Sequence, residues 1–190
     1  MKLKSLLLKP FYHVESGSDQ ERKVMKSAIS LAGFVVFFDL LSKVAIVEVL
    51  KNPGTRISVI PGIFDITYIT NKGAAWGMFS GKGALLLTVS VVVFVLITFF
   101  LKQICEGWTE RYYALLLVIS GIVGNSVDRI FRGAVVDFLR FHWQNKIEWP
   151  SFNIADSAIC AGVFIFVLSM LIRPEKKKKD DSQNAAGQAD

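Results

Sequence analysis

GALLLTVSVVVFVLITFFL, residues 83–101, is a run of nineteen residues without one charged side chain. An α-helix rises about 1.5 Å per residue, so the run is roughly 28 Å long as a helix. That length is close to the ~30 Å thickness of the hydrocarbon core of a bilayer. The run therefore predicts a helix that crosses a membrane.

Three further apolar stretches lie outward from this run. Residues 112–127 and 157–172 carry no charge over sixteen positions each, and residues 27–47 are interrupted only by Asp39 and Lys43. Apolar residues make up 52% of the chain and come in blocks, which excludes a disordered, fibrous or ordinary soluble protein. With their flanks included, we predict a membrane all-α protein with four transmembrane helices at about residues 27–47, 83–102, 111–131 and 153–173.

The distribution of charge predicts how these spans are oriented. The net charge is +6, and the basic residues flank apolar runs, which indicates a membrane surface and not nucleic acid as the partner. The side that holds both termini carries 13 Lys and Arg residues and the other side 8, so the positive-inside rule places both termini in the cytoplasm. Residues 1–26 are then a cytoplasmic extension, 27–173 the membrane domain and 174–190 a disordered, lysine-rich cytoplasmic tail.

The segment between the first two spans differs from the rest of the chain. Residues 57–70, ISVIPGIFDITYIT, combine β-branched and aromatic residues with a Pro-Gly turn. We predict a small extracytoplasmic β-sheet within about residues 55–82, which rests on the bilayer or on the helix ends because two strands alone are marginal in water. Residues 132–152 are predicted to be a loop on the same side.

Carboxylates in and beside the spans are the informative feature. A charge inside a span costs at least ~2.5–3.5 kcal/mol, so an Asp retained there usually faces the bundle interior. Counting along the third and fourth spans puts Asp128 about 24 Å and Asp156 about 26 Å from the same membrane boundary. Asp137 follows in a loop that can fold back to this level, and Asp39 interrupts the first span. We therefore expect three or four carboxylates near one depth.

Local spacing refines this expectation and leaves simpler interpretations open. Asn125, Asp128 and Arg129 share one helical face, where Asp128 and Arg129 can form a structural ion pair. Asn153 is a candidate N-cap with Asp156 three residues later, so a plain helix cap explains both residues equally well. Asp39 and Lys43, at i and i+4, form a favourable and structural pair.

Other chemistries fit the sequence less well. His13 and His142 lack the spacing of metal ligands, and Cys105 and Cys160 form no redox motif and are expected to pack in the fold. No metal or cofactor site is therefore predicted.

Two other functional classes match single features of the sequence but not its overall pattern. Ser42-Lys43 suggests a Ser/Lys protease, but adjacent residues on a helix point about 100° apart and cannot hydrogen-bond as nucleophile and base. An ion or proton transporter needs polar and charged residues through the membrane depth, and residues 83–101 of the second span carry no charged side chain.

Five motifs in this order resemble those of bacterial lipoprotein signal peptidase, also called signal peptidase II. The resemblance covers roughly residues 27–173 and lies in FFDLLSK (37–43), NKGAAWG (71–77), GNSVDR (124–129), VVDF (135–138) and FNIADSA (152–158).

The resemblance implies an intramembrane aspartic protease of the bacterial inner membrane. Such an enzyme removes signal peptides from prolipoproteins by cutting before the diacylglyceryl-modified cysteine, near the periplasmic face. It implies a catalytic pair of Asp137 and Asp156, no cofactor, a β-cradle and small lid within residues 55–82, and sensitivity to globomycin. We further expect a monomer in contact with membrane lipids. The supporting positions that match are Asp39, Lys43, Asn71, Gly73, Asn125, Asp128, Arg129 and Asn153.

The implied chemistry is physically reasonable. Two carboxyls that share one proton can hydrolyse an amide, because the ionised one takes a proton from water while the other donates to the carbonyl oxygen. Asp156 is expected to be the more acidic member because it begins a helix.

The remaining polar positions suggest roles around the substrate. Asn71 and Asn125 can hydrogen-bond its backbone, and Gly73 allows close backbone approach. Arg129 can hold a main-chain carbonyl of the substrate or of the loop that carries Asp137.

Overall fold

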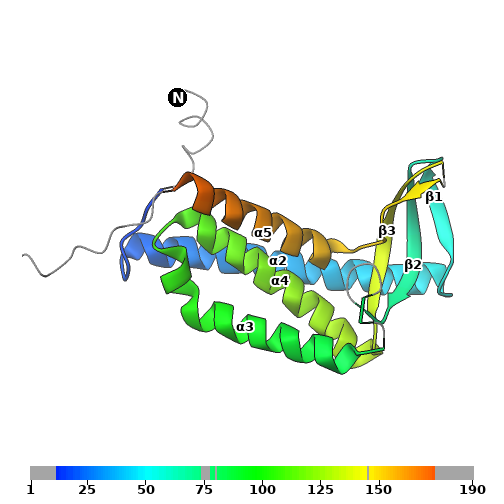
Figure 1. Cartoon of the computed structure of the whole chain (residues 1–190), viewed down its shortest axis with the longest axis horizontal. Helices are drawn as coiled ribbons and strands as arrows, with labels where there is room; N and C mark the ends of the chain where they lie inside the picture. Colours follow the sequence, from blue (N-terminus) through cyan, green and yellow to red (C-terminus); the bar gives the residue numbers. More distant parts are fainter. Residues whose placement is uncertain (1–11, 74–77, 80, 145, 174–190) are drawn as a thin grey trace, which may run out of the picture.

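The computed structural model describes residues 12–73, 78–79, 81–144 and 146–173, and four long helices dominate it (Figure 1). These are α2 (Asp19–Leu50), α3 (Gly83–Cys105), α4 (Thr109–Arg132) and α5 (Ile154–Ile172). Each is long and apolar enough to cross a membrane, which confirms the four predicted spans. Most of the predicted extension (1–11), part of the predicted lid (74–77 and 80) and the predicted tail (174–190) lie outside the described residues.

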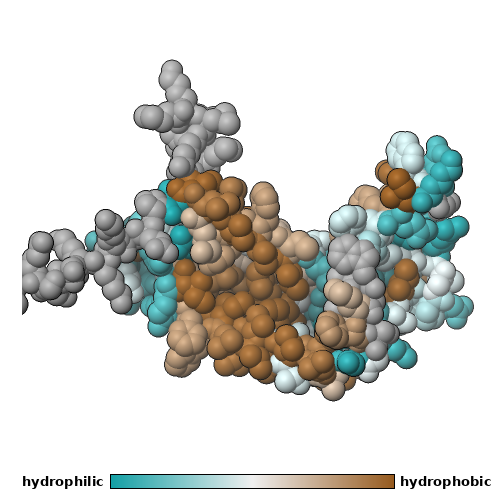
Figure 2. Space-filling model, viewed as in Figure 1, coloured by the Kyte–Doolittle hydropathy of each residue, from teal (hydrophilic) through white to brown (hydrophobic). Residues whose placement is uncertain are grey.

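The helices expose apolar side chains around the bundle, as a lipid environment requires. Figure 2 shows these side chains gathered over the helices, with hydrophilic residues toward both ends of the molecule. Phe99 on α3 and Leu171 on α5 are among the large apolar residues left exposed. The surface of the bundle is therefore matched to hydrocarbon.

The first helix is longer than its predicted span. It begins at Asp19, eight residues before position 27, because the Ser18 hydroxyl caps it by accepting from the Glu21 amide at 3.1 Å. Preceding residues also pack at this end: the Val14 amide donates to the Gly107 carbonyl at 2.8 Å, and the Val14 side chain is buried. Part of the N-terminal extension is thus docked on the α3–α4 turn.

Helix α4 lies at the centre of the bundle and packs against each of the other three helices. Its contact with α5 depends on glycine, because a Cβ on Gly121 would collide with the Ala155 carbonyl oxygen. A Cβ on Gly162 of α5 would likewise collide with the Ala114 carbonyl oxygen. Small residues at such a crossing let two membrane helices approach closely.

Replacing Gly162 with alanine should lower the stability of the protein by about 1–3 kcal/mol, because the added methyl group forces α4 and α5 apart. Thermal unfolding in detergent would measure the change. Gly33→Ala on α2 is the matched control, since a Cβ there meets nothing within 4 Å. Equal melting temperatures for the two variants would contradict the close-packed crossing.

One antiparallel sheet lies across the ends of the helices, in the strand order β1-β2-β3-β4 (Figure 1). The prediction of a small sheet is confirmed for β1 (Arg56–Ile60) and β2 (Phe64–Asn71). The segment between the third and fourth spans, predicted to be a loop, adds β3 (Val135–Trp143) and β4 (Ile147–Glu148).

The pairing of β2 with β3 brings distant parts of the sequence together. Asn71 pairs with Val135 and Ile69 with Asp137, so the end of β2 lies beside the start of β3. This register carries Asp137 from the connection after α4 to the end of the bundle, where α5 begins.

Candidate active site

A cavity of about 880 Å³ lies where the sheet meets the helices. The ends of β2 and β3, helix α4, and the beginning of α5 with the segment before it line the cavity. Asp137 and Asp156 both face it, together with Asn71, Gly73, Asn125 and Arg129. The structure therefore gathers most of the predicted site residues around one space.

Asp137 is buried on β3, and two amides hold its carboxylate. Asn71 donates through Nδ2 to Oδ2 at 3.0 Å, and Asn153 donates through Nδ2 to Oδ1 at 2.8 Å. The first contact follows from the strand register, and the second comes from the residue that caps α5. The orientation of the Asp137 carboxylate is thereby set from both of its oxygens.

The environment of Asp137 favours its protonated form. Burial raises the pKa of this carboxyl to about 7, and the negative charge of Asp156 adds to the effect. The hydrogen bonds from Asn71 and Asn153 lower the pKa of Asp137, but they do not cancel the rise caused by burial and by Asp156. Asp137 can thus carry a proton near neutral pH.

Asp156 stands in the first turn of α5. The Asn153 side chain accepts from the Asp156 amide at 2.9 Å, and Asp156 Oδ2 accepts from the Asn153 amide at 3.2 Å. This capping box agrees with the simpler interpretation of the two residues as a helix cap. The same Asn153 also binds Asp137, so one side chain contacts both carboxylate-bearing residues.

Asn125 connects Asp156 to the interior of the bundle. Its Nδ2 donates to Asp156 Oδ1 at 2.8 Å, while its Oδ1 accepts from Lys43 Nζ at 3.0 Å and from Asn153 Nδ2 at 3.2 Å. Because two donors meet the amide oxygen, the amide nitrogen must point toward Asp156. Lys43 therefore determines which group Asn125 presents to the cavity.

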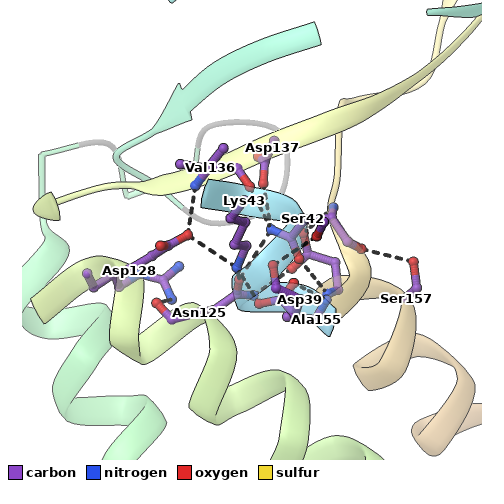
Figure 3. A network of polar contacts seen from close by, with 12 residues as sticks. Asp39, Ser42, Lys43, Asn125, Asp128, Val136, Asp137, Ala155 and Ser157 are labelled. Carbon is purple, nitrogen blue, oxygen red and sulfur yellow. Dashed lines mark hydrogen bonds and ion pairs between the residues drawn. The ribbon is translucent and has the colours of Figure 1, made fainter. Parts of the chain in front are cut away.

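A buried cluster of charges lies beneath these residues (Figure 3). Lys43 is fully buried, with its Nζ 2.8 Å from Asp39 Oδ2 and 3.2 Å from Asp128 Oδ2. The predicted pair of Asp39 and Lys43 is therefore formed. Arg132, one turn after Asp128 on α4, also contacts Asp128.

Asp39 and Asp128 each hold the backbone next to a cavity aspartate. Asp39 Oδ1 accepts from the Ala155 amide at 2.8 Å, and Ala155 directly precedes Asp156. Asp128 Oδ2 accepts from the Val136 amide at 3.0 Å, and Val136 directly precedes Asp137. Two buried carboxylates linked by one lysine thus fix the positions of both candidate catalytic residues.

Arg129 does not take the structural role that its spacing suggested. Asp128 pairs with Lys43 and Arg132, so the predicted Asp128–Arg129 ion pair is wrong in its partner. Arg129 lines the cavity and donates to the Gly73 carbonyl at 3.3 Å. It therefore does hold a main-chain carbonyl, but one from the segment after β2 and not from the strand that carries Asp137.

The structure gives the two predicted substrate-binding amides a further task. Asn71 and Asn125 face the cavity, yet each donates to one of its aspartates. Asn71 also accepts from the Gly73 amide at 2.9 Å, which shapes the turn that follows β2.

The Ser/Lys alternative does not match the geometry. The Ser42 hydroxyl donates to the Asp39 carbonyl of its own helix at 2.9 Å, while Lys43 Nζ is bound to Asp39, Asp128 and Asn125. Within the described part of the chain, no three His, Cys, Asp or Glu residues are grouped so as to hold a metal ion.

Comparison with known proteins identifies the family to which this chain belongs. Residues 31–172 match the family model of signal peptidase (SPase) II. The chain belongs to the signal peptidase II family. The lipoprotein signal peptidase of Geobacter metallireducens is 39% identical over 129 residues, which cover 66% of this chain and 78% of that protein. The lipoprotein signal peptidase of Syntrophotalea carbinolica is 40% identical over 143 residues, or 73% and 87% of the two chains.

Solved structures agree with membership of the signal peptidase II family. One structure of a bacterial membrane enzyme superposes with a TM-score of 0.71 at 31% identity, covering 82% of this chain and 93% of that one. A second gives a TM-score of 0.66 at 32% identity, covering 77% and 93%. The protein is therefore a multi-pass membrane protein of a peptidase family.

Proposed function

We propose that the protein is an intramembrane aspartic endopeptidase that removes signal peptides from prolipoproteins. It cleaves on the N-terminal side of the diacylglyceryl-modified cysteine, with Asp137 and Asp156 as the catalytic pair and water as the nucleophile. The observation that carries the proposal is geometric. Both carboxylates line one cavity, both residues bind Asn153, and a buried ion cluster holds the backbone on which each stands.

The two aspartates divide the chemistry between them. Ionised Asp156 takes a proton from water, the resulting oxygen nucleophile attacks the scissile carbonyl carbon, and protonated Asp137 donates to the carbonyl oxygen. When the tetrahedral intermediate collapses, Asp156 returns its proton to the leaving nitrogen and Asp137 recovers its own. The raised pKa of Asp137 supports this assignment, as does the place of Asp156 at the beginning of α5.

The location of the cavity suits a lipid-modified substrate. It lies at the sheet end of four helices whose outer surface is apolar, so water can enter while the diacylglyceryl chains stay in the bilayer. We assign the protein to the bacterial inner membrane as a monomer, with both termini in the cytoplasm and the cavity at the periplasmic face. Globomycin-type peptides would compete for the same cavity.

The direct test is cleavage of a diacylglyceryl-modified precursor by the purified full-length protein in detergent. We expect one cut before the modified cysteine, without an ion gradient and without inhibition by EDTA. Strong inhibition by EDTA would indicate a metal mechanism, and an intact precursor would refute the proposed function.

In the same assay, the rate should fall as the pH rises through about 7. Asp137 must be protonated to act as the acid, and above that pH it loses its proton. The hydrogen bond from Asn71 lowers the pKa of Asp137, so Asn71→Ala should move this decline to higher pH. Asn52→Ala, at an exposed position, serves as the control. An unchanged pH profile for Asn71→Ala would remove Asp137 from the role of acid.

A further inference from the structure

The segment between β4 and the cap of α5, residues 149–152, lines the cavity along its whole length. We call it the rim segment. Hydrogen bonds hold both of its ends against β3: the Trp149 amide donates to the Phe141 carbonyl at 2.9 Å, and the Phe152 amide donates to the Leu139 carbonyl at 3.1 Å. The backbone of the rim segment is therefore fixed by the sheet.

Trp149 is the large side chain at the edge of the cavity. It lines the cavity, yet 60% of its surface is exposed. Pro150 follows it, and a proline restricts the residue before it to extended conformations. A tryptophan on such a backbone has few torsions left to lose when a partner covers it. The indole ring therefore offers a bound molecule a wide contact area at a low entropic cost.

Ile69 is a second apolar residue of the cavity, and it lies beside a carboxylate. It is 37% exposed on β2 and pairs directly with Asp137 on β3. Directly opposed residues of an antiparallel pair lie on the same face of a sheet, with their Cβ atoms about 4.5–5.5 Å apart. Asn71, two residues further along β2, binds Asp137 Oδ2. Ile69 therefore faces the cavity next to the proposed catalytic pair.

The cavity has a membrane side and a sheet side. Helix α5 spans the membrane, and its cavity-lining residues Ile159 and Cys160 lie about one turn beyond Asp156. Ile69 and the rim segment belong to the opposite end of the cavity, where Figure 1 shows α5 joined to the sheet by a short connection. Asp156 thus stands at the boundary between an apolar helix and the sheet.

We propose that Ile69 and Trp149 form a subsite for the first residues of the mature chain, those that follow the modified cysteine, and that this subsite favours apolar side chains. The inference rests on the proposed function. The signal peptide and the acyl chains of such a precursor lie in the bilayer and take the membrane side, whereas the chain after the cysteine leaves into water past the sheet.

The spacing along β3 indicates how many residues of the substrate this subsite contacts. The Trp149 amide is bound at Phe141, four positions along β3 from Asp137. Four residues of an extended chain span roughly 13 Å. A substrate that begins at the proposed catalytic pair therefore passes Ile69 first and reaches Trp149 within about four residues.

Cleavage kinetics of two diacylglyceryl-modified precursors test the subsite. They differ only in the four residues after the modified cysteine, which are all glycine in one and all leucine in the other. The parent should show a KM about fivefold lower for the leucine precursor, because leucine buries apolar area against both residues. Trp149→Ala and Ile69→Ala should each reduce this ratio to about twofold or less, through KM and not through kcat.

The sheet offers a matched control for each variant. Trp143 is 59% exposed on β3 and Ile57 is 48% exposed on β1, and neither lines the cavity. Trp143→Ala and Ile57→Ala should keep the parental ratio. Trp149→Phe retains an aromatic ring and should recover most of the preference that Trp149→Ala loses, which distinguishes a contact with substrate from a folding defect.

Three outcomes would overturn the subsite. The first is a parent without preference for the leucine precursor, and the second is a parental ratio in Trp149→Ala. The third is a Trp149→Ala variant that changes discrimination between acyl chain lengths, or between last residues of the signal peptide, because this residue would then serve the membrane side.

A binding measurement separates the subsite from the proposed function. Fluorescence anisotropy in detergent would follow two labelled product peptides, a diacylglyceryl-cysteine followed by four glycines or by four leucines. The leucine peptide should bind the parent about fivefold more tightly, and Trp149→Ala should remove most of this difference. A parent that cuts neither precursor would refute the proposed function, while this binding difference would leave the subsite standing. Equal binding of the two peptides by the parent would refute the subsite even if both precursors are cut.

Discussion

Asp137→Asn and Asp156→Asn should each lower the turnover of a lipid-modified precursor by about 10²–10⁴-fold or more, because in the proposed mechanism each removes a group that transfers a proton in the transition state. An amide in place of Asp137 can accept the same bonds from Asn71 and Asn153 through one oxygen only, and it has no proton to give at neutral pH. An amide in place of Asp156 cannot deprotonate water. Both effects are on the rate constant and not on folding.

Asp19→Asn is the matched control for these variants. Asp19 is an exposed carboxylate at the opposite end of the molecule from the cavity, paired only with Arg22 in the described part of the chain. All three variants should be expressed and melt close to the parent, and all three should bind a globomycin-type peptide. Near-parental cleavage by either cavity variant would remove that residue from the catalytic pair.

Lys43→Met should lower the stability of the protein by about 3–5 kcal/mol, the usual cost of leaving a buried charge without its partner. Methionine fills a similar volume but leaves Asp39 and Asp128 facing each other in the bundle. These two carboxylates hold the amides of Ala155 and Val136, so the backbone of both proposed catalytic residues should loosen as well. Thermal unfolding in detergent measures the first effect.

The control is Lys23→Met on the same helix, because Lys23 is exposed and should contribute little. A second measurement separates positioning from stability. At a temperature where Lys43→Met is still folded, its rate constant for cleavage should fall more than its apparent affinity for substrate. A variant that is unstable but fully active when folded would show that the cluster serves folding alone.

The spans were predictable because hydropathy is a local property of the sequence. The segment at residues 83–101 needed no partner to be recognised, and the helix there begins and ends within a few residues of the prediction. The start of the first helix was missed because residues 19–26 are mostly polar, and their helical structure depends on the Ser18 cap and on packing at the α3–α4 turn.

The sheet was only half predictable. The strand at residues 135–143 opens with VVDFLRF, whose apolar residues do not alternate strictly, and its pairing partners run from Asn71, paired with Val135, back to Phe64, paired with Phe141. Pairing over that distance leaves no local signal. The predicted loop was correct in bringing Asp137 back to the helix ends, but a strand does so by a fixed register.

The sequence predicted which residues form the site, but not which of their side chains contact one another. Motif spacing selected the aspartates and their polar neighbours, yet it could not show that Asn153 caps α5 and binds Asp137 at once. It also paired Asp128 with the adjacent Arg129, although Arg132, at i+4, is the arginine whose spacing brings it next to Asp128 on a helix. Side-chain orientation depends on groups from several helices, which no local pattern contains.

The buried cluster also bears on how the chain is made. Asp39 and Lys43 sit one turn apart on α2, and Asp128 and Arg132 sit one turn apart on α4. Each of these helices therefore brings its own counter-ion, and can leave the translocation machinery as a nearly neutral segment before the other has been synthesised. Lys43 on α2 can contact Asp128 on α4 only when the two helices meet. Their association in the bilayer is therefore the step that completes the buried cluster.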